Sequence, residues 1–234
     1  MPAKYIYIIL TYVAVQLSAF LVIPFRLYTN VDPLTLMVGW NIGSFVLALI
    51  ISCYLLRDEI NSFFQSRDKR IGQIVLWTIL GFFLVLIAQV ASTVIERFVF
   101  GAPVGSENTM QLMQVARQAP IFIILISILG PILEELVFRK AIFGSLYKKM
   151  NFFFAGIISG VLFAVLHNDF SHLLTYIAVA FVLAFIYVET KRILVPILAH
   201  MAMNTFAVIG QLSLDPEEME QMLEQVQFIL VGGF

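Results

Sequence analysis

Long apolar runs dominate this chain, and short polar stretches that carry most of its charge separate them. Seven runs are long enough, or nearly so, to cross a bilayer as helices, for which about 20 apolar residues are needed. The runs are continuous and lack the two-residue alternation of a barrel strand, so helices are favoured over a barrel. The predicted spans are residues 5–25, 34–56, 71–95, 119–146, 152–168, 173–188 and 194–211.

The composition agrees with this division. Of 234 residues, 61% are hydrophobic and 12% are charged, whereas a soluble domain is about 45–50% apolar and about 25% charged. Mean hydropathy is +0.95. We therefore expect an all-α, polytopic transmembrane bundle of about seven or eight helices, in contact with the lipid bilayer. The first run has no small-residue cleavage site, so it is interpreted as a retained span.

Charge and cysteine content exclude several classes of function. A net charge of -1 provides no basic surface for nucleic acid. The single cysteine, Cys53, excludes a disulfide framework and a cysteine-based metal site.

The positions of lysine and arginine predict the orientation, because cytoplasmic loops are enriched in both. Nine basic residues lie before the first span or in the loops after the second, fourth and sixth spans, against three in the alternate loops. This places the N-terminus in the cytoplasm. The nine are Lys4, Arg57, Arg67, Lys69, Arg70, Lys148, Lys149, Lys191 and Arg192, and the three are Arg26, Arg97 and Arg117.

We divide the chain, as one membrane domain, into three parts. Residues 1–118 hold the first three spans and carry almost no internal charge, although the segment GWNIG, residues 39–43, has the small-xxx-small spacing that predicts close helix packing. Residues 119–211 hold most of the polar side chains at membrane depth, so we expect the chemistry there. Residues 212–234 form an acidic, amphipathic tail, and the sequence leaves open whether it crosses the membrane.

The apolar segment ILGPILEELVFRKAIF, residues 128–143, contains Glu134, Glu135 and Arg139. A charge at the centre of a span costs about 2.5–3.5 kcal/mol on insertion scales, so these groups need partners. Glu135 and Arg139 are four residues apart on one helical face and are predicted to pair. Glu134 is turned about 100° away and is left over. The preceding Gly130–Pro131 is expected to bend the helix and make room beside Glu134.

The expected partners are on two later spans. FAVLH places Phe163 and His167 four residues apart, and HMAMN does the same for His200 and Asn204, so each pair lies on one helical face. Straight helices would hold the two histidines at different depths, and tilt or a short helix is needed to bring them together.

Two chemical interpretations fit this set. A desolvated Glu134, assisted by His167, can deprotonate a water molecule for attack on a carbonyl, and His200 and Asn204 can donate to the oxyanion. Alternatively, Glu134, His167 and His200 can hold a divalent metal such as zinc, although the helical HExxH signature is absent.

Other interpretations remain open. Intramembrane carboxylates and histidines also serve small proton-coupled transporters, and a non-enzymatic immunity or scaffold protein can hold a partner helix in the membrane. Asn204 alone is most simply interhelical packing. His172 and Asp169, in the short loop NDFSH, are expected at the surface or interface, and Glu189 is expected to be a solvated loop charge.

Three motifs in order, EExxxR, FxxxH and HxxxN, resemble those of the CAAX prenyl endopeptidase family. This family is also called the Abi, CPBP or bacteriocin-processing family of intramembrane proteases. Here the motifs are EELVFR with Glu134, Glu135 and Arg139, FAVLH with Phe163 and His167, and HMAMN with His200 and Asn204. The resemblance covers about residues 119–211.

The resemblance implies a bundle of roughly eight helices with a conical cavity and an enzyme that cleaves a membrane-associated protein or peptide. It implies that Glu134 and His167 activate water and that His200 and Asn204 form the oxyanion hole. Glu135, Arg139 and Phe163 would support the site. It favours a glutamate-dependent mechanism without a cofactor, with the zinc enzyme as the alternative. It also implies a bacterial cell membrane, and it does not identify the substrate.

Overall fold

The computed structural model describes residues 1–65, 70–103 and 105–213, and every regular element among them is helical. Of the predicted tail, residues 212 and 213 end the last described helix, and residues 214–234 lie outside the described residues. In chain order the elements are α1 (Ala3–Phe25), η1 (Arg26–Tyr28), α2 (Pro33–Leu55), α3 (Arg57–Gln65), α4 (Ile71–Phe100), α5 (Glu107–Gln118), α6 (Phe122–Ile124), η2 (Leu125–Leu129), α7 (Gly130–Glu134), η3 (Glu135–Phe143), α8 (Gly144–Leu146), α9 (Phe152–Leu166), η4 (Phe170–His172), α10 (Leu173–Thr190) and α11 (Leu194–Ser213).

The predicted all-α membrane bundle is confirmed. Five helical stretches among the described residues are long and apolar enough to cross a membrane: Ala3–Tyr28, Pro33–Leu55, Ile71–Phe100, Phe170–Thr190 and Leu194–Ser213. A sixth apolar helix, α9, is shorter. The predicted span 119–146 is helical but divided into α6, η2, α7, η3 and α8. The expected seven or eight helices are therefore compatible with the structure.

Helix α4 is longer than the predicted span 71–95, because it continues to Phe100. Arg97, which the sequence placed in a loop, lies in the last turn of α4. There its guanidinium donates to the carbonyl of Ala102 at 2.8 Å. Gly101 ends the helix with a φ of 68°, a conformation that costs glycine little.

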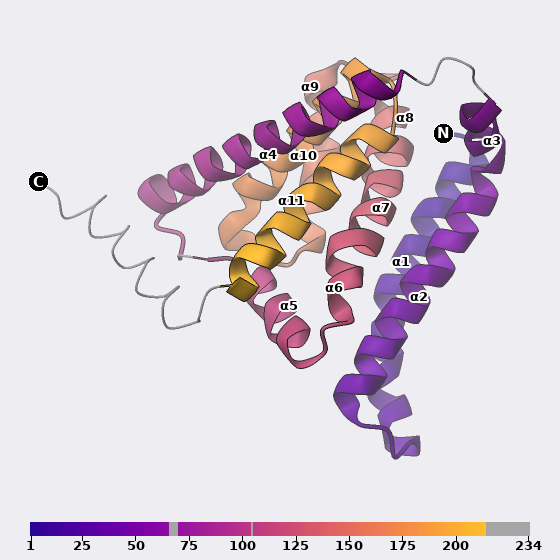
Figure 1. Ribbon diagram of the computed structural model, residues 1–234, viewed down its shortest axis with the longest axis vertical. Coiled ribbons are helices and arrows are strands. Elements are labelled where there is room, and N and C mark those ends of the chain that lie inside the picture. Colours follow the sequence, from indigo (N-terminus) through magenta and orange to yellow (C-terminus); the bar gives the residue numbers. More distant parts are fainter. Residues whose placement is uncertain (66–69, 104, 214–234) are drawn as a thin grey trace, which may run out of the picture.

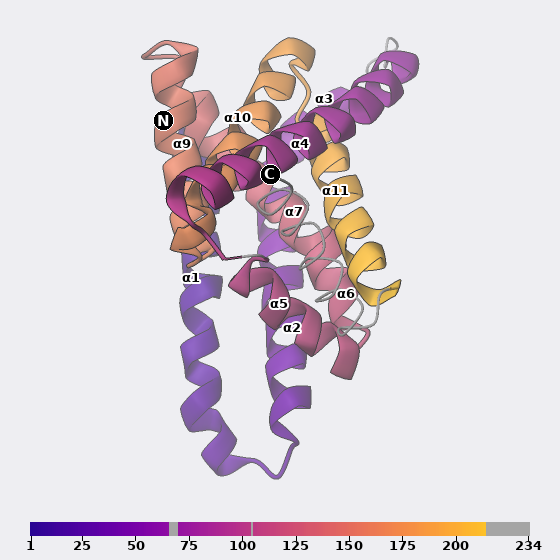
Figure 2. The same ribbon diagram turned by 90° about the vertical axis from the view of Figure 1, so that its left-hand side faces the viewer.

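The helices form two parts that meet along η3 and its neighbours (Figure 1). α1 and α2 run side by side as an antiparallel pair, and both views show them continuing beyond the other helices at the end where η1 lies (Figure 2). α1 packs on η3, and α2 packs on α7 and η2. On the other side of η3 lies α9, which packs on α10, and α10 and α11 both pack on α4.

Glycines allow the closest helix approaches in the second part. A methyl group on Gly81 of α4 would lie 2.8 Å from Ile186 of α10 and 3.1 Å from Ala199 of α11. One on Gly156 of α9 would lie 2.8 Å from the ring of Phe181. Small residues at such contacts let backbones pack closely without lipid between them.

The close packing predicted for segment 39–43 is wrong. A methyl group on Gly39 or on Gly43 would meet no atom within 4 Å. The small-xxx-small spacing describes which residues share a face, but a face packs closely only if another helix reaches it. α1 instead contacts α2 through larger side chains, including the bond from Trp40 to Ser18 at 3.1 Å.

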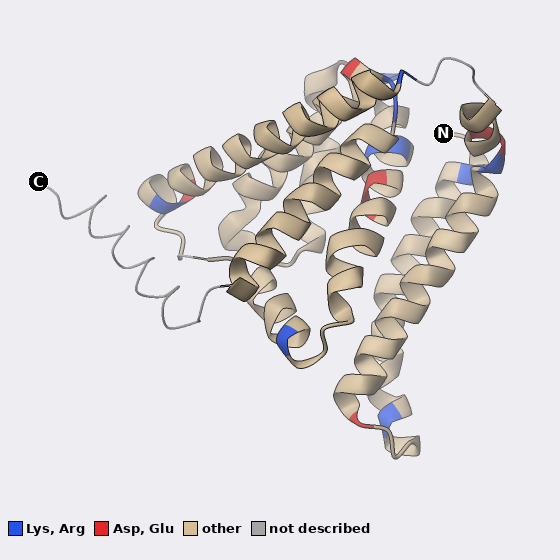
Figure 3. Cartoon of the chain, viewed as in Figure 1, with Lys and Arg blue, Asp and Glu red and all other residues tan. Residues whose placement is uncertain are grey.

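Basic residues gather at one end of the bundle. Figure 3 shows Lys and Arg, in blue, around the start of the chain, α3, α8 and the turn between α10 and α11, with fewer at the opposite end. Ion pairs tie this end together. Glu59 of α3 pairs with Lys4 of α1 at 2.6 Å and also with Lys140 of η3.

The stretch that carries the clustered charges is partly a π-helix. η2 and η3 are π-helical, and each is followed by a glycine whose N–H donates to the carbonyl five residues earlier: Gly130 to Leu125, and Gly144 to Arg139. Pro131, which has no N–H to donate, comes directly after Gly130. π-helical turns are rare and often occur at functional sites, and here they flank Glu134.

Candidate active site

Two adjacent glutamates lie where α7 passes into η3. Glu135 is completely buried, and its Oε2 lies 3.1 Å from Nε of the equally buried Arg139. The predicted pairing of these two residues is therefore present in the structure. Glu134 keeps 17% of its side chain exposed, and it lies over Gly130, at whose position a methyl group would come 3.8 Å from the Glu134 carboxylate.

His200, on α11, joins both glutamates. Its Nδ1 lies 2.9 Å from Oε1 of Glu135, and its Nε2 lies 3.8 Å from Oε2 of Glu134. The ring is buried. Glu134 was expected to point away from the Glu135–Arg139 pair and to share a cavity with His200. Because the two ring nitrogens of His200 face in different directions, each of the neighbouring carboxylates approaches one of them.

His167 follows the last residue of α9 and reaches the same region from another side. Its Nδ1 lies 2.8 Å from the carbonyl of Phe163. The ring of Phe163 lies 4.5 Å from that of His167 and 6.2 Å from that of His200, measured between centroids. The short α9 and this shared neighbour bring together two histidines that straight helices would hold at different depths.

A row of rings runs beside the site from α1 to α10. We call it the aromatic row, and its members are Tyr12, Phe138, Phe163, His167 and Tyr176. Tyr12 packs edge-on against Phe138 at 6.0 Å, and Phe138 packs edge-on against Phe163 at 5.2 Å. His167 stacks on Tyr176 with 4.2 Å between centroids. No motif in the sequence indicates Tyr12 or Tyr176, because an aromatic residue in an apolar helix resembles any other packing residue.

Hydrogen bonds and a cation–π contact fix the positions of rings in the aromatic row. The hydroxyl of Tyr176 bonds with that of Ser106 at 3.1 Å, which links α10 to the start of α5. Ser159 of α9 donates to the carbonyl of Phe138 at 2.9 Å. The guanidinium of Arg139 lies 4.5 Å above the ring of Phe163, so the aromatic row and the charge cluster share a contact.

Asn204 lies one turn beyond His200 and donates to the carbonyl of Ile126 at 3.0 Å. In the π-helical pattern the donor for that carbonyl would be residue 131, and Pro131 has no N–H. The side-chain amide of Asn204 thus replaces a missing backbone donor. An amide nitrogen carries two hydrogens, so this bond uses one of its two donors.

These contacts determine which nitrogen of each imidazole carries hydrogen. A carbonyl only accepts, so Nδ1 of His167 donates to Phe163, and in the neutral ring its Nε2 is the basic atom. Nδ1 of His200 donates to the Glu135 carboxylate. Its Nε2 faces Glu134. In the neutral ring this nitrogen carries no hydrogen and can accept a proton, and in the charged ring it carries a hydrogen and can donate it.

The positions of the acidic and histidine side chains also bear on whether the site could hold a metal ion. Among the residues that the structure describes, no three His, Cys, Asp or Glu side chains are placed so that they could hold one metal ion. Glu134, His167 and His200, the alternative metal ligands, thus lie in one region but are not arranged around one metal position.

A second polar cluster, near His167, was not expected. His172 and Asp169 are each 4% exposed, and Nδ1 of His172 lies 3.2 Å from the Asp169 carboxylate. The prediction that they lie at the surface is wrong, because α4 and α10 pack on η4, and Ser106 and Asn108 at the start of α5 bond to Asp169. Burial disfavours the charged carboxylate, but hydrogen bonds from Ser106 and His172 outweigh it, so the pKa of Asp169 lies below its ordinary value.

Glu96 of α4 was also missed, because it follows the predicted end of the third span. It is 2% exposed, and its two oxygens accept from the backbone N–H and the hydroxyl of Thr175, at 2.9 and 2.7 Å. A carboxylate at the first turn of α10 is stabilised by the unpaired N–H groups there. This cap fixes the start of the helix that carries Tyr176.

The structure therefore brings the predicted residues together as one group. Glu134, Glu135, Arg139 and His200 form its charged centre, and His167, Phe163 and Asn204 border it. Glu189, in contrast, is exposed as expected, but it lies in the last turn of α10 and not in a loop.

The family model described as Type II CAAX prenyl endopeptidase Rce1-like matches residues 116–206. YdiL of Bacillus subtilis (strain 168), which is named as a membrane peptidase, is 44% identical over 243 aligned residues that cover 100% of both chains. The membrane-embedded CAAX protease MroQ of Staphylococcus aureus (strain USA300) is 42% identical over 162 residues, covering 67% of this chain and 65% of MroQ. No solved structure matches the chain.

Proposed function

The chain belongs to the Rce1-like CAAX prenyl endopeptidase family, and from this premise we propose that it hydrolyses a peptide bond in a membrane-associated protein or peptide, with Glu134 and His167 activating water. The observation that supports this most is the pair of contacts on His200. One of its nitrogens is anchored on the buried Glu135–Arg139 pair, and the other faces Glu134, whose carboxylate stays partly exposed.

In the proposed reaction, Glu134 accepts a proton from water while Nε2 of His167 helps to orient that water. The oxygen of the water forms a bond to the carbonyl carbon, and the carbonyl electron pair moves onto its oxygen. The C–N bond then breaks, and the proton held by Glu134 passes to the departing nitrogen. One water is consumed, and a carboxylate and an amine are released.

We assign oxyanion stabilisation to His200 and Asn204. The amide of Asn204 has a second hydrogen beyond the one given to Ile126. For Nε2 of His200 to donate, the ring must carry both hydrogens, and the two carboxylates beside it would balance that charge. Two preorganised donors of this kind are typical of acyl-transfer sites.

Glu135, Arg139 and Phe163 are proposed to position these groups without touching the reacting atoms. Glu135 orients His200, Arg139 neutralises Glu135, and Phe163 separates the two imidazoles. A buried carboxylate without its cation would be costly in a membrane span, so these roles are coupled.

The chain is a multi-pass integral membrane protein, and we propose that it resides in a bacterial cell membrane with its N-terminus in the cytoplasm. The gathering of lysine and arginine at the end where the chain starts supports this orientation (Figure 3). Rapid protease cleavage of a tag at residue 1 in inside-out vesicles, but not in intact cells, is the expected result.

The substitution Glu134→Gln tests the proposal. Cells carrying wild type or Glu134→Gln are compared by quantitative mass spectrometry of membrane peptides and of the fragments released from them. Processing should fall by about 100-fold or more, because general-base catalysis typically contributes that much. Glu107→Gln, at an exposed position in the first turn of α5, is the matched control. Unchanged processing in Glu134→Gln protein that is present at wild-type levels would reject the mechanism.

Metal dependence is tested separately. We propose a reaction without a metal cofactor, so purified protein should keep its activity after exhaustive chelation, and elemental analysis should find no stoichiometric zinc. Loss of activity on chelation, restored by zinc alone, would instead support the metalloprotease alternative with Glu134, His167 and His200 as ligands.

A further inference from the structure

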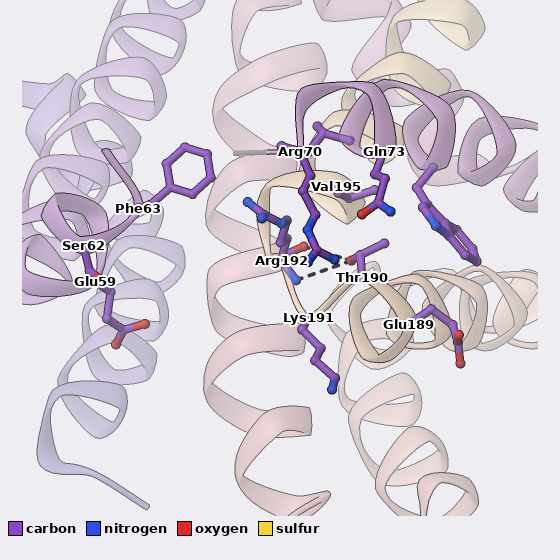
Figure 4. A pocket seen from close by; sticks show the side chains of 12 residues that line it. Glu59, Ser62, Phe63, Arg70, Gln73, Glu189, Thr190, Lys191, Arg192 and Val195 are labelled. Carbon is purple, nitrogen blue, oxygen red and sulfur yellow. Dashed lines mark hydrogen bonds between the residues drawn. The ribbon is translucent and has the colours of Figure 1, made fainter. Parts of the chain in front are cut away.

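A cavity of ≈670 Å³ that shares no residue with the candidate active site opens at the basic end of the bundle (Figure 4). Its walls come from α3, from the first two turns of α4, and from the turn that joins α10 to α11. Such a volume lies in the range of small-molecule sites, about 300–1,000 Å³.

Among the described residues, three cationic side chains and two carboxylates line this cavity. Arg70, Lys191 and Arg192 line it, and in Figure 4 the side chains of Arg70 and Arg192 lie beside Thr190. Of the two lining carboxylates, Glu59 already pairs with Lys4 and Lys140. Glu189 is exposed, and Figure 4 shows it pointing away from the two arginines.

The backbone around these cations is held in a specific shape. Lys191 has a φ of 53° and Arg70 a φ of 46°, a left-handed region that residues other than glycine and asparagine seldom occupy. Lys191 ends α10, and Arg70 precedes α4. The hydroxyl of Thr190 donates to the carbonyl of Ile186 at 2.7 Å, and it accepts from the N–H of Arg192 at 3.4 Å. These bonds hold the backbone of Arg192 in place, and so they limit where its side chain can reach.

Apolar and aromatic groups complete the site. Phe63 and Trp77 line the cavity, and the guanidinium of Arg192 lies 5.8 Å from the Phe63 ring centroid. On the same turns of α4, Val75 and Leu76 are 52% and 55% exposed. A cationic cavity beside exposed apolar residues and a tryptophan is typical of the level at which lipid headgroups lie.

We propose that this cavity binds a phosphate group, and that its source is the headgroup of an anionic phospholipid whose acyl chains lie along the exposed face of α4. Guanidinium groups bind phosphate oxygens through paired, charge-assisted hydrogen bonds. Gln73, which also lines the cavity and lies near the two arginines in Figure 4, supplies a further donor. The exposed apolar residues favour a lipid over a soluble phosphate.

The two tryptophans make a direct test possible. Trp77 lines the cavity, whereas Trp40 lies in α2 and bonds Ser18. In a Trp40→Phe background, the full chain is reconstituted in phosphatidylcholine vesicles containing brominated phosphatidylglycerol or, separately, brominated phosphatidylcholine. Trp77 fluorescence should be quenched at much lower mole fractions of the anionic lipid.

The variants then assign the effect to the cavity. Arg70→Gln combined with Arg192→Gln should raise the half-quenching mole fraction of brominated phosphatidylglycerol by about tenfold. Arg57→Gln, at the same end of the bundle but outside the cavity, with its guanidinium over Tyr54, should leave it unchanged. Equal quenching by both brominated lipids, or an equal loss in Arg57→Gln, would overturn the proposal, since only general charge attraction would remain.

A second measurement separates the two phosphate sources and does not depend on Trp40→Phe. Native mass spectrometry of the otherwise unchanged protein should show phosphatidylglycerol retained by wild type and lost from the double arginine variant. Inorganic phosphate added to the vesicles at constant ionic strength should not displace the lipid. Displacement by millimolar phosphate would overturn the lipid source, and retention of phosphatidylglycerol by the double variant would overturn the site itself.

Discussion

Arg139 and Lys140 are consecutive residues of η3, yet they serve charge clusters of opposite character. Arg139 is 1% exposed and pairs with Glu135, which is completely buried. Lys140 is 12% exposed and pairs with Glu59, which keeps 35% of its side chain exposed. One cluster lies inside the bundle beside the proposed catalytic groups, and the other ties α1, α3 and η3 at the basic end.

The difference between the two clusters is one of dielectric environment. Taking a charge into a buried site costs several kcal/mol, which its partner offsets only while both are present. An ion pair open to water contributes about 0–1 kcal/mol, because water screens the charges and the side chains lose freedom. Removing one partner from the buried cluster should therefore lower the free energy of unfolding strongly. Removing one partner from the more exposed cluster should lower it only a little.

The largest effect is expected for Arg139→Met. Removing this cation leaves Glu135 buried with only the hydrogen bond from His200, so the free energy of unfolding should fall by about 3–5 kcal/mol. Lys140→Met, one residue further on, is the control and should cost less than about 1 kcal/mol. Unfolding in mixed micelles, followed by circular dichroism, measures both. Similar losses in the two variants would show that the clusters do not differ as described.

The next largest effect should follow Asn204→Ala. It leaves the Ile126 carbonyl without the donor that replaces the missing N–H of Pro131, which should cost about 1–3 kcal/mol of stability. Activity should fall further than stability explains, because the proposed oxyanion donor is also lost. Asn41→Ala is the comparison, since Asn41 donates only to Met37 on its own helix. If Asn204→Ala lowers stability but not the rate of folded enzyme, its role is structural alone.

Tyr176 offers a test of the aromatic row. Tyr176→Leu removes the ring stacked on His167, an interaction of about 0.5–1.5 kcal/mol, so the rate constant should fall by roughly tenfold. Tyr176→Phe keeps the ring and loses only the hydroxyl bonds to Ser106 and Asn108, and should retain most activity. The pH dependence of the rate distinguishes positioning from simple packing. A Tyr176→Leu profile identical in shape and height to wild type would contradict the positioning role.

The smallest effect concerns the exposed cluster and pH. Partial burial raises the pKa of Glu59, but hydrogen bonds and attraction from Lys140 and Lys4 outweigh this, and its pKa lies below the ordinary value of 4.5. A carboxylate whose pKa is lower in the folded state contributes stability above pH 4.5, and this is lost as pH falls through the folded value.

Because Glu59 is about a third exposed, we expect that loss to be under about 1 kcal/mol. Melting temperatures of wild type and Glu59→Gln should differ slightly at pH 7 and converge as pH drops below 4.5. A difference that grows on acidification would contradict the assignment. Glu107→Gln again provides an exposed control.

Much of this architecture could be predicted from composition and motif spacing. The membrane class follows from run length, and the Glu135–Arg139 pair follows from a separation of four residues. Close packing at Gly39 and Gly43 could not be judged in the same way, because spacing identifies a face and not what lies against it. The buried Asp169–His172 pair was missed for a related reason, since a loop of polar residues gives no sign that α4 and α10 will pack on it.

The sequence by itself determined which segments enter the membrane and which rare polar residues lie in them, because the cost of placing charge in hydrocarbon makes such residues stand out in any apolar run. Only the tertiary structure decided how these residues meet. The π-helical turns around Pro131, the short α9 and the ring of Phe163 bring Glu134, His167 and His200 into one region. These depend on contacts between helices distant in the chain, which no local pattern encodes.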